Sequence, residues 1–130
     1  NSKFNYNKFN LISNVQYVTD IAFMDFNHDG KPDVLLLSSP HNGDLIDGFS
    51  INVLINQGNS FVDKTSDYID VKDHHPKDTH VAWMRRIRLF DFDKDGDIDI
   101  VCDGPIVDQG FPLKYYVWKN EGGKFVYGEY

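Results

Sequence analysis

A nine-residue loop rich in aspartate occurs twice in this chain, and its repetition constrains the fold more than any other feature. The first copy runs from Asp25 to Asp33 and the second from Asp91 to Asp99. Residues 21–33 align with 87–99 at an offset of 66 with six identities, and 51–62 align with 115–126 at an offset of 64 with five. Two blocks that match in the same order at nearly the same offset indicate a fold built from two similar units.

Each unit is predicted to contain four short antiparallel strands. An apolar run precedes and follows each aspartate loop, and the continuous run Val34–Leu37 is typical of a strand covered on both faces. Asn- and Gly-rich turns at 56–59 and 120–123 fit tight hairpins. The predicted strands are 21–24, 34–37, 50–55 and 61–62 in the first unit, and 87–90, 98–102, 114–119 and 124–127 in the second. Residues 9–12 also have strand character, and residues 1–18 resemble the end of a preceding unit.

The composition favours strands and turns and narrows the classes of function. Of the 20 acidic residues 18 are Asp, and there are only two Ala, whereas Glu and Ala are strong helix formers. The 13 basic residues are spread thinly over a chain of net charge −7, so nucleic-acid binding is not expected. No apolar run approaches the ~18–20 residues of a membrane span. The single cysteine, Cys102, lies in an apolar run and is expected to be a buried thiol.

The loop pattern D-x-[DN]-x-D-G-x-x-D predicts a calcium site in each unit. Oxygen ligands at alternating positions of a tight loop converge on one centre and suit a hard cation, and flexible coordination by six or seven oxygens favours Ca²⁺ over Mg²⁺. Lys31 and Asp97, at position 7, are expected to contribute backbone carbonyls. The candidate metal-binding residues are Asp25, Asn27, Asp29, Lys31 and Asp33 in the first loop, and Asp91, Asp93, Asp95, Asp97 and Asp99 in the second.

Two other interpretations of the loops are open from the sequence. An EF-hand requires Glu at position 12 between two helices, but position 12 is Leu36 or Cys102 and the flanks are strand-like. Asp, Asn and Gly also form turns without any metal. Three or four carboxylates in one loop would then repel one another, and this repulsion favours a bound cation with a structural role.

Together with their flanking strands, these residues resemble the FG-GAP/VCBS repeat family, the calcium-loop blades of integrin α-subunit-like β-propellers. The matching pieces are F-M-D-F-N-H-D-G-K-P-D-V-L-L-L, L-F-D-F-D-K-D-G-D-I-D-I-V, N-V-L-I-N-Q-G-N-S-F-V-D-K-T and Y-V-W-K-N-E-G-G-K-F-V. The resemblance implies an all-β fold of antiparallel four-stranded propeller-type blades, with Ca²⁺ held at a blade rim by the loop side chains and one carbonyl. The Phe-Gly-Gly-Ala-Pro signature of integrin repeats is absent, so the VCBS-type variant of large secreted and surface proteins fits better.

The number of units does not decide how the chain relates to a complete propeller. Propellers usually have ~4–8 blades, whereas this chain holds about two, at about 20–65 and 85–127. Residues 1–130 are expected to form a single domain. The chain is then a fragment of a longer propeller, one of several copies in a homo-oligomer, or a compact two-repeat domain.

The expected function is that of a calcium-binding, non-enzymatic module for binding, adhesion or scaffolding. No G-x-S-x-G, H-E-x-x-H or Walker loop is present. Loops 39–49 and 103–113 are expected to display the surface for a protein or carbohydrate ligand. The expected location is extracellular, at the cell surface or periplasmic, where calcium reaches the millimolar range. Two alternatives remain: part of a calcium-dependent enzyme acting on polysaccharides, and a small inhibitor-type β domain that binds a partner enzyme.

Three further groups of side chains are candidate sites, and each has a structural alternative. The histidines at 74, 75 and 80 could bind a transition metal, but Pro76 breaks any helix that would align them, so a solvated loop is favoured. An arginine cluster could bind an anion or lie on a solvated edge strand. A set of aromatic residues could form a binding platform or belong to the core. These groups are His74, His75 and His80; Arg85, Arg86 and Arg88; and Trp83, Phe111, Tyr115, Tyr116 and Trp118.

Overall fold

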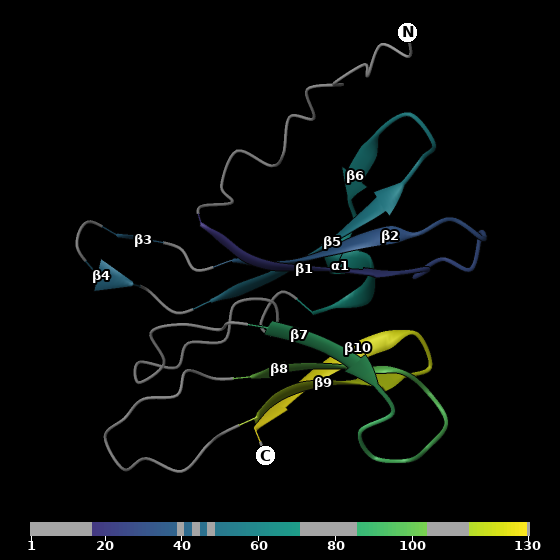
Figure 1. Cartoon of the computed structure of the whole chain (residues 1–130). Coiled ribbons are helices and arrows are strands. Elements are labelled where there is room, and N and C mark those ends of the chain that lie inside the picture. The colour runs from purple at the N-terminus through teal and green to yellow at the C-terminus, as the bar shows by residue number, and fades with distance from the viewer. Residues whose placement is uncertain are drawn as a thin grey trace, which may run out of the picture.

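The chain folds into two four-stranded antiparallel sheets that face each other (Figure 1). The computed structural model describes residues 17–38, 41–42, 45–46, 49–70, 86–103 and 115–129. Sheet 1 has the strand order β1-β2-β5-β6, and sheet 2 has the order β10-β9-β8-β7. The strands of sheet 1 are β1 (Val18–Met24), β2 (Asp33–Ser38), β5 (Ser50–Asn56) and β6 (Phe61–Asp63). Those of sheet 2 are β7 (Arg86–Phe90), β8 (Asp99–Asp103), β9 (Tyr115–Glu121) and β10 (Lys124–Glu129). The all-β prediction of two four-stranded units is therefore confirmed.

Two short elements fall where the sequence predicts loops. A two-residue strand pair, β3 (His41–Asn42) with β4 (Leu45–Ile46), lies within the predicted loop 39–49. A single helical turn, α1 (Thr65–Tyr68), begins the connector after β6. The strand expected at 9–12, the histidine cluster and most of the loop 103–113 lie outside the described residues. Within the described ranges, no helix has the length and hydropathy that a membrane crossing requires.

The hydrophobic core lies between the two sheets. Alternate residues of β2 and β5 face sheet 2, and alternate residues of β8 and β9 face sheet 1, as expected when one face of each pleated strand is buried against the other sheet. Phe49 packs edge-on against Trp118, with ring centroids 5.9 Å apart. The central contributors are Leu35, Leu37, Ile51, Val53, Ile100, Cys102, Tyr116 and Trp118.

The burial of these residues decides several of the sequence-based alternatives. Cys102 is a buried free thiol, as predicted. Tyr116 and Trp118 are fully buried, so these two aromatic residues belong to the core and not to a binding platform. Tyr115 remains exposed, and Arg86 and Arg88 are exposed on β7, an edge strand. Trp83, Phe111 and Arg85 lie outside the described residues.

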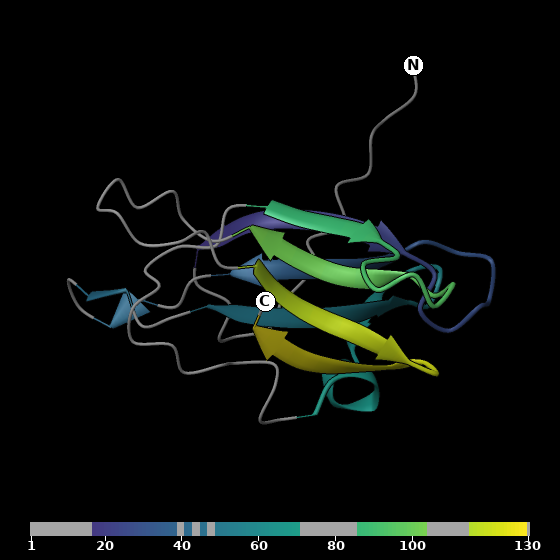
Figure 2. The same ribbon diagram turned by 90° about the horizontal axis from the view of Figure 1, so that it is seen from below.

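The two sheets are also joined along their edges. Edge strands β1 and β7 lie side by side, as both views show (Figures 1 and 2). The Ile87 backbone amide donates to Asp20 Oδ2 at 2.7 Å across this seam. At the other edge, Ile69 forms a parallel bridge with Phe125 of β10. The β1–β2 and β7–β8 loops, which contain the aspartate repeats, lie at the same end of the molecule (Figure 2).

Candidate metal centre

Position 1 of each loop is an aspartate that folds the loop around its own carboxylate. Asp25 Oδ1 accepts from the Asp29 amide at 3.0 Å, and Asp25 Oδ2 accepts from the Gly30 amide at 2.8 Å. In the second loop, Asp91 accepts from the amides of Asp95 and Gly96 at 3.1 Å each. The aspartate at position 1 therefore binds the same two amides in both loops.

Position 9 is a fully buried aspartate that ties the loop to the neighbouring hairpin. Asp33 Oδ2 accepts from the Phe26 amide at 2.8 Å, and Asp33 Oδ1 accepts from the Asn56 amide at 2.7 Å. Asp99 accepts from the equivalent amides, those of Phe92 and Asn120, both at 2.8 Å. A buried carboxylate needs such donors, since an unpaired charge away from water is costly.

In each unit, an asparagine at the end of the third strand also binds the aspartate loop to the hairpin. The Asn56 side-chain amide donates to the Pro32 carbonyl at 3.0 Å, and its Oδ1 accepts from the Gly58 amide at 2.8 Å. The Asn120 side-chain amide likewise donates to the Ile98 carbonyl at 3.3 Å, and its Oδ1 accepts from the amide of Gly123, three residues on instead of two. From the sequence alone, this asparagine is predicted only to belong to the hairpin turn. The same residue type stands at the equivalent position of both repeats, and this was the feature of the sequence that could have indicated its contact with the aspartate loop.

Positions 3 and 5 of the first loop bind each other and a lysine. The Asn27 side-chain amide donates to Asp29 Oδ2 at 3.1 Å, and the Lys31 ammonium lies 3.1 Å from the same oxygen. The pKa of Asp29 is held below its ordinary value, chiefly by the Lys31 backbone amide and then by the Lys31 ammonium. The Asp29 carboxylate is therefore negatively charged at neutral pH, as a carboxylate ligand of a cation must be.

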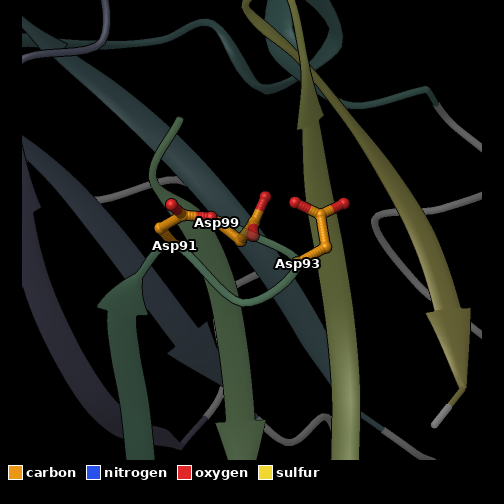
Figure 3. A group of neighbouring side chains, drawn as sticks. All are labelled: Asp91, Asp93 and Asp99. Atoms are coloured by element: carbon orange, nitrogen blue, oxygen red, sulfur yellow. The ribbon is translucent and has the colours of Figure 1, made fainter. Parts of the chain in front are cut away.

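In the second loop, three carboxylates converge. Ligand oxygens of Asp91, Asp93 and Asp99 all lie within 4.8 Å of one another, and this is the group of three acidic ligands found among the described residues (Figure 3). The ammonium of Lys119, on β9, lies 3.3 Å from Asp93 Oδ2. Asp95 binds the Asp97 amide through Oδ1 at 2.9 Å, as Asp29 binds that of Lys31. The carbonyl ligands expected from Lys31 and Asp97 stay predictions.

The loop backbone takes a left-handed turn at two positions in each copy. Position 4 is His28 in one loop and Lys94 in the other, with φ of 57° and 66°, and position 6 is Gly30 or Gly96, with φ of 81° and 102°. Only glycine adopts positive φ without strain. The sequence indicated this for the glycines, but nothing in it marked His28 and Lys94.

An aromatic group lies close to the first loop. The ring of Tyr68, on α1, is 5.4 Å from that of Phe26, centroid to centroid. Burial raises the pKa of the Tyr68 phenol, and the negative charges of Asp33, Asp67, Asp25 and Asp29 raise it further. The loop aspartates therefore act electrostatically on the Tyr68 phenol. The spacing of these residues in the sequence does not indicate that Tyr68 lies near the loop.

The donor set fits a hard divalent cation. The second loop gathers three carboxylates, the ligand type that Ca²⁺ prefers, with no nitrogen or sulfur ligand in the group, whereas Asp25, Asp29 and Asp33 of the first loop do not form so close a group. The second loop alone carries five Asp against Lys94 within it and Lys119 beside it. A divalent ion would relieve the repulsion among these carboxylates.

The fold and the loops together define a class of β-repeat proteins with aspartate-rich loops. An FG-GAP-like repeat matches residues 25–102, which is more than half of the chain. The chain therefore belongs to the FG-GAP-like repeat family, as its sequence predicted. Such repeats are typical of non-catalytic, β-propeller-type binding and adhesion modules in extracellular or surface proteins, and they often bind Ca²⁺. No curated protein and no solved structure matches the chain.

Proposed function

We propose that this protein is a calcium-stabilised, non-catalytic binding module of a secreted or surface protein. The observation that carries the proposal is the duplicate hydrogen-bond pattern of the two loops, in which Asp25 and Asp91 bind equivalent amides, as do Asp33 and Asp99. Retention of one hydrogen-bond pattern in two units that differ at many other positions is expected when both loops serve the same ligand.

In this proposal, Asp25, Asn27, Asp29 and Asp33 hold one Ca²⁺, and the equivalent ligands Asp91, Asp93, Asp95 and Asp99 hold another. Bound calcium would supply positive charge that neutralises the loop carboxylates. The protein's own contribution is to orient those carboxylates: the buried Asp33 and Asp99 fix each loop against a hairpin. The loops then form a rigid rim at one end of the two sheets, and a protein or carbohydrate partner binds the module. Millimolar extracellular calcium suits loops of this kind.

The experiment that tests calcium binding is native mass spectrometry with Ca²⁺ and after chelation. Wild-type protein is expected to carry two Ca²⁺ per chain, and the variants Asp29→Asn and Asp93→Asn one each. Asp93 suits this test because it forms an ion pair with Lys119, while the loop amides of Asp95 and Gly96 are bound by Asp91 and stay bound when Asp93 is changed. A parallel titration with Mg²⁺ should show weaker retention, since Mg²⁺ gives up its water reluctantly.

The matched control is Asp67→Asn, which removes an equal charge from the exposed face of α1, where Asp67 pairs with Lys64. It should still carry two Ca²⁺. A wild-type chain that is folded by circular dichroism and yet binds no Ca²⁺ would overturn the proposal.

A further inference from the structure

The two aspartate loops differ at positions that set their charge. Position 3 is Asn27 in the first loop and Asp93 in the second. Position 7 is Lys31 in the first loop and Asp97 in the second. The first loop contains three Asp and one Lys, a formal charge of −2 with His28 neutral, whereas the second contains five Asp and one Lys, a formal charge of −4. The two loops therefore attract a cation unequally.

In the first loop, the carboxylate at position 5 is bound by donors of the loop itself. Asp29 Oδ2 lies 3.1 Å from the Asn27 side-chain nitrogen and 3.1 Å from the Lys31 ammonium. Asn27 Oδ1 in turn accepts from the Asp29 backbone amide at 3.1 Å. A cation that uses these oxygens has to compete with their donors, and it meets the positive charge of Lys31 beside its ligand.

In the second loop, position 3 adds a carboxylate where the first loop has a neutral amide. Asp93 converges with Asp91 and Asp99 within 4.8 Å (Figure 3). Asp95, at position 5, accepts from the Asp97 amide at 2.9 Å, and no lysine follows it at position 7. Because closely spaced carboxylates repel one another, this loop gains more from a divalent cation than the first loop does.

A lysine on a neighbouring strand offsets only part of this charge. The Lys119 ammonium, on β9, lies 3.3 Å from Asp93 Oδ2, and the first unit has Ile55 at the equivalent position. With Lys119 included, the formal charge around the second loop is −3, which is still more negative than that of the first loop. The order of the two loops in negative charge is therefore unchanged.

We propose that the two loops bind Ca²⁺ in a fixed order, in which the second loop fills first and the first loop binds about tenfold or more weakly, because ligand charge count tunes calcium affinity. Lys31 and Asn27 set the lower affinity of the first loop. This inference rests on the proposed calcium binding and adds its regulation: as calcium falls, the first loop empties while the second stays occupied.

The test is a calcium titration of the full chain followed by ¹H–¹⁵N NMR, over free Ca²⁺ from about 1 μM to about 10 mM. The amides of Gly30 and Gly96 each donate to the position 1 carboxylate of their own loop, so each reports one loop. The Gly96 signal is expected to shift at a free Ca²⁺ concentration about tenfold or more below that for Gly30. Shifts that coincide, or a Gly30 shift that comes first, would overturn this inference and leave calcium binding intact. A folded chain in which neither signal shifts would instead overturn the proposed function on which the inference rests.

A charge-removing variant tests the role assigned to Lys31. Lys31→Met keeps the backbone amide and removes the ammonium, so it should raise the calcium affinity of the first loop by about fivefold or more in about 0.15 M salt. The Gly96 midpoint should stay in place. The matched control is Lys64→Met, which removes an exposed ammonium that pairs with Asp67 outside both loops, and it should leave both midpoints unchanged. An unchanged Gly30 midpoint in Lys31→Met, or an equal shift in the control, would show that this ammonium does not set the order of binding.

Asn27→Asp tests the other half of the assignment. It gives the first loop the carboxylate that Asp93 supplies in the second, so the Gly30 midpoint should move toward that of Gly96. A Gly30 midpoint that stayed in place or moved to higher calcium would contradict the role of charge at position 3.

Discussion

At the scale of single residues, the backbone at Gly96 limits what the second loop tolerates. Its φ is +102°, and a Cβ built there would meet no atom within 4 Å. Gly96→Ala should therefore lower the free energy of unfolding by roughly 1–2 kcal/mol through backbone strain alone, without a steric clash. Urea unfolding in the presence of a chelator measures this loss without a contribution from bound metal.

A second variant, Gly96→Asn, tests whether the loss of stability depends on how well the new residue tolerates positive φ. Asn tolerates positive φ better than Ala does, so it should lose less stability. Because the site has space for a side chain, equal stability of Gly96→Ala and wild type would show that the loop backbone relaxes away from the left-handed turn. The prediction would then be wrong.

At the scale of elements, the hydroxyl group of Thr65 links α1 to sheet 1. The Val53 amide, in β5, donates to Thr65 Oγ1 at 3.0 Å, and the Thr65 hydroxyl donates to Asp63 Oδ1 at 2.6 Å. Thr65 is buried, so Thr65→Val leaves the Val53 amide without its partner. The expected loss is about 1–3 kcal/mol of unfolding free energy, measured by urea denaturation.

Thr65→Ser is the control for this prediction, because it keeps the hydroxyl and loses only a methyl group. It should retain most of the stability. If the valine variant were as stable as the serine variant, the hydroxyl would not be what fixes α1 to β5.

The sequence predicted the elements of this fold better than the contacts between them. All eight strands of the two sheets follow from local apolar runs and turns, since these patterns are contained in a few neighbouring residues. Helix α1 was not predicted, because it depends on a bond between Thr65 and β5, twelve residues earlier. The loop ligands were identifiable from spacing, but the bonds from Asp33 and Asp99 to distant hairpin amides depend on how the strands pair.

At the scale of the whole molecule, the sequence could indicate two units but not which faces they share. Leu35 and Leu36 are adjacent, equally apolar and both buried, yet only Leu35 belongs to the cluster between the sheets. A continuous apolar strand gives no alternation from which to choose a face. The choice is made by tertiary packing, in which Trp118 and Phe49 fill the space between the sheets.

This shared core predicts that the two repeats unfold together. Leu37, in sheet 1, is fully buried in the cluster that also contains Trp118 of sheet 2. Leu37→Ala should cost about 2–5 kcal/mol of unfolding free energy. In a Trp83→Phe background, Trp118 is the remaining tryptophan, so its fluorescence reports sheet 2 while far-ultraviolet circular dichroism reports both sheets. Since one core spans both sheets, the two signals should shift to lower urea by the same amount and stay coincident. A fluorescence midpoint that remained in place while the dichroism split into two steps would mean that each repeat is stable alone. The interface between the sheets would then be a weak contact instead of the common core of one cooperative unit.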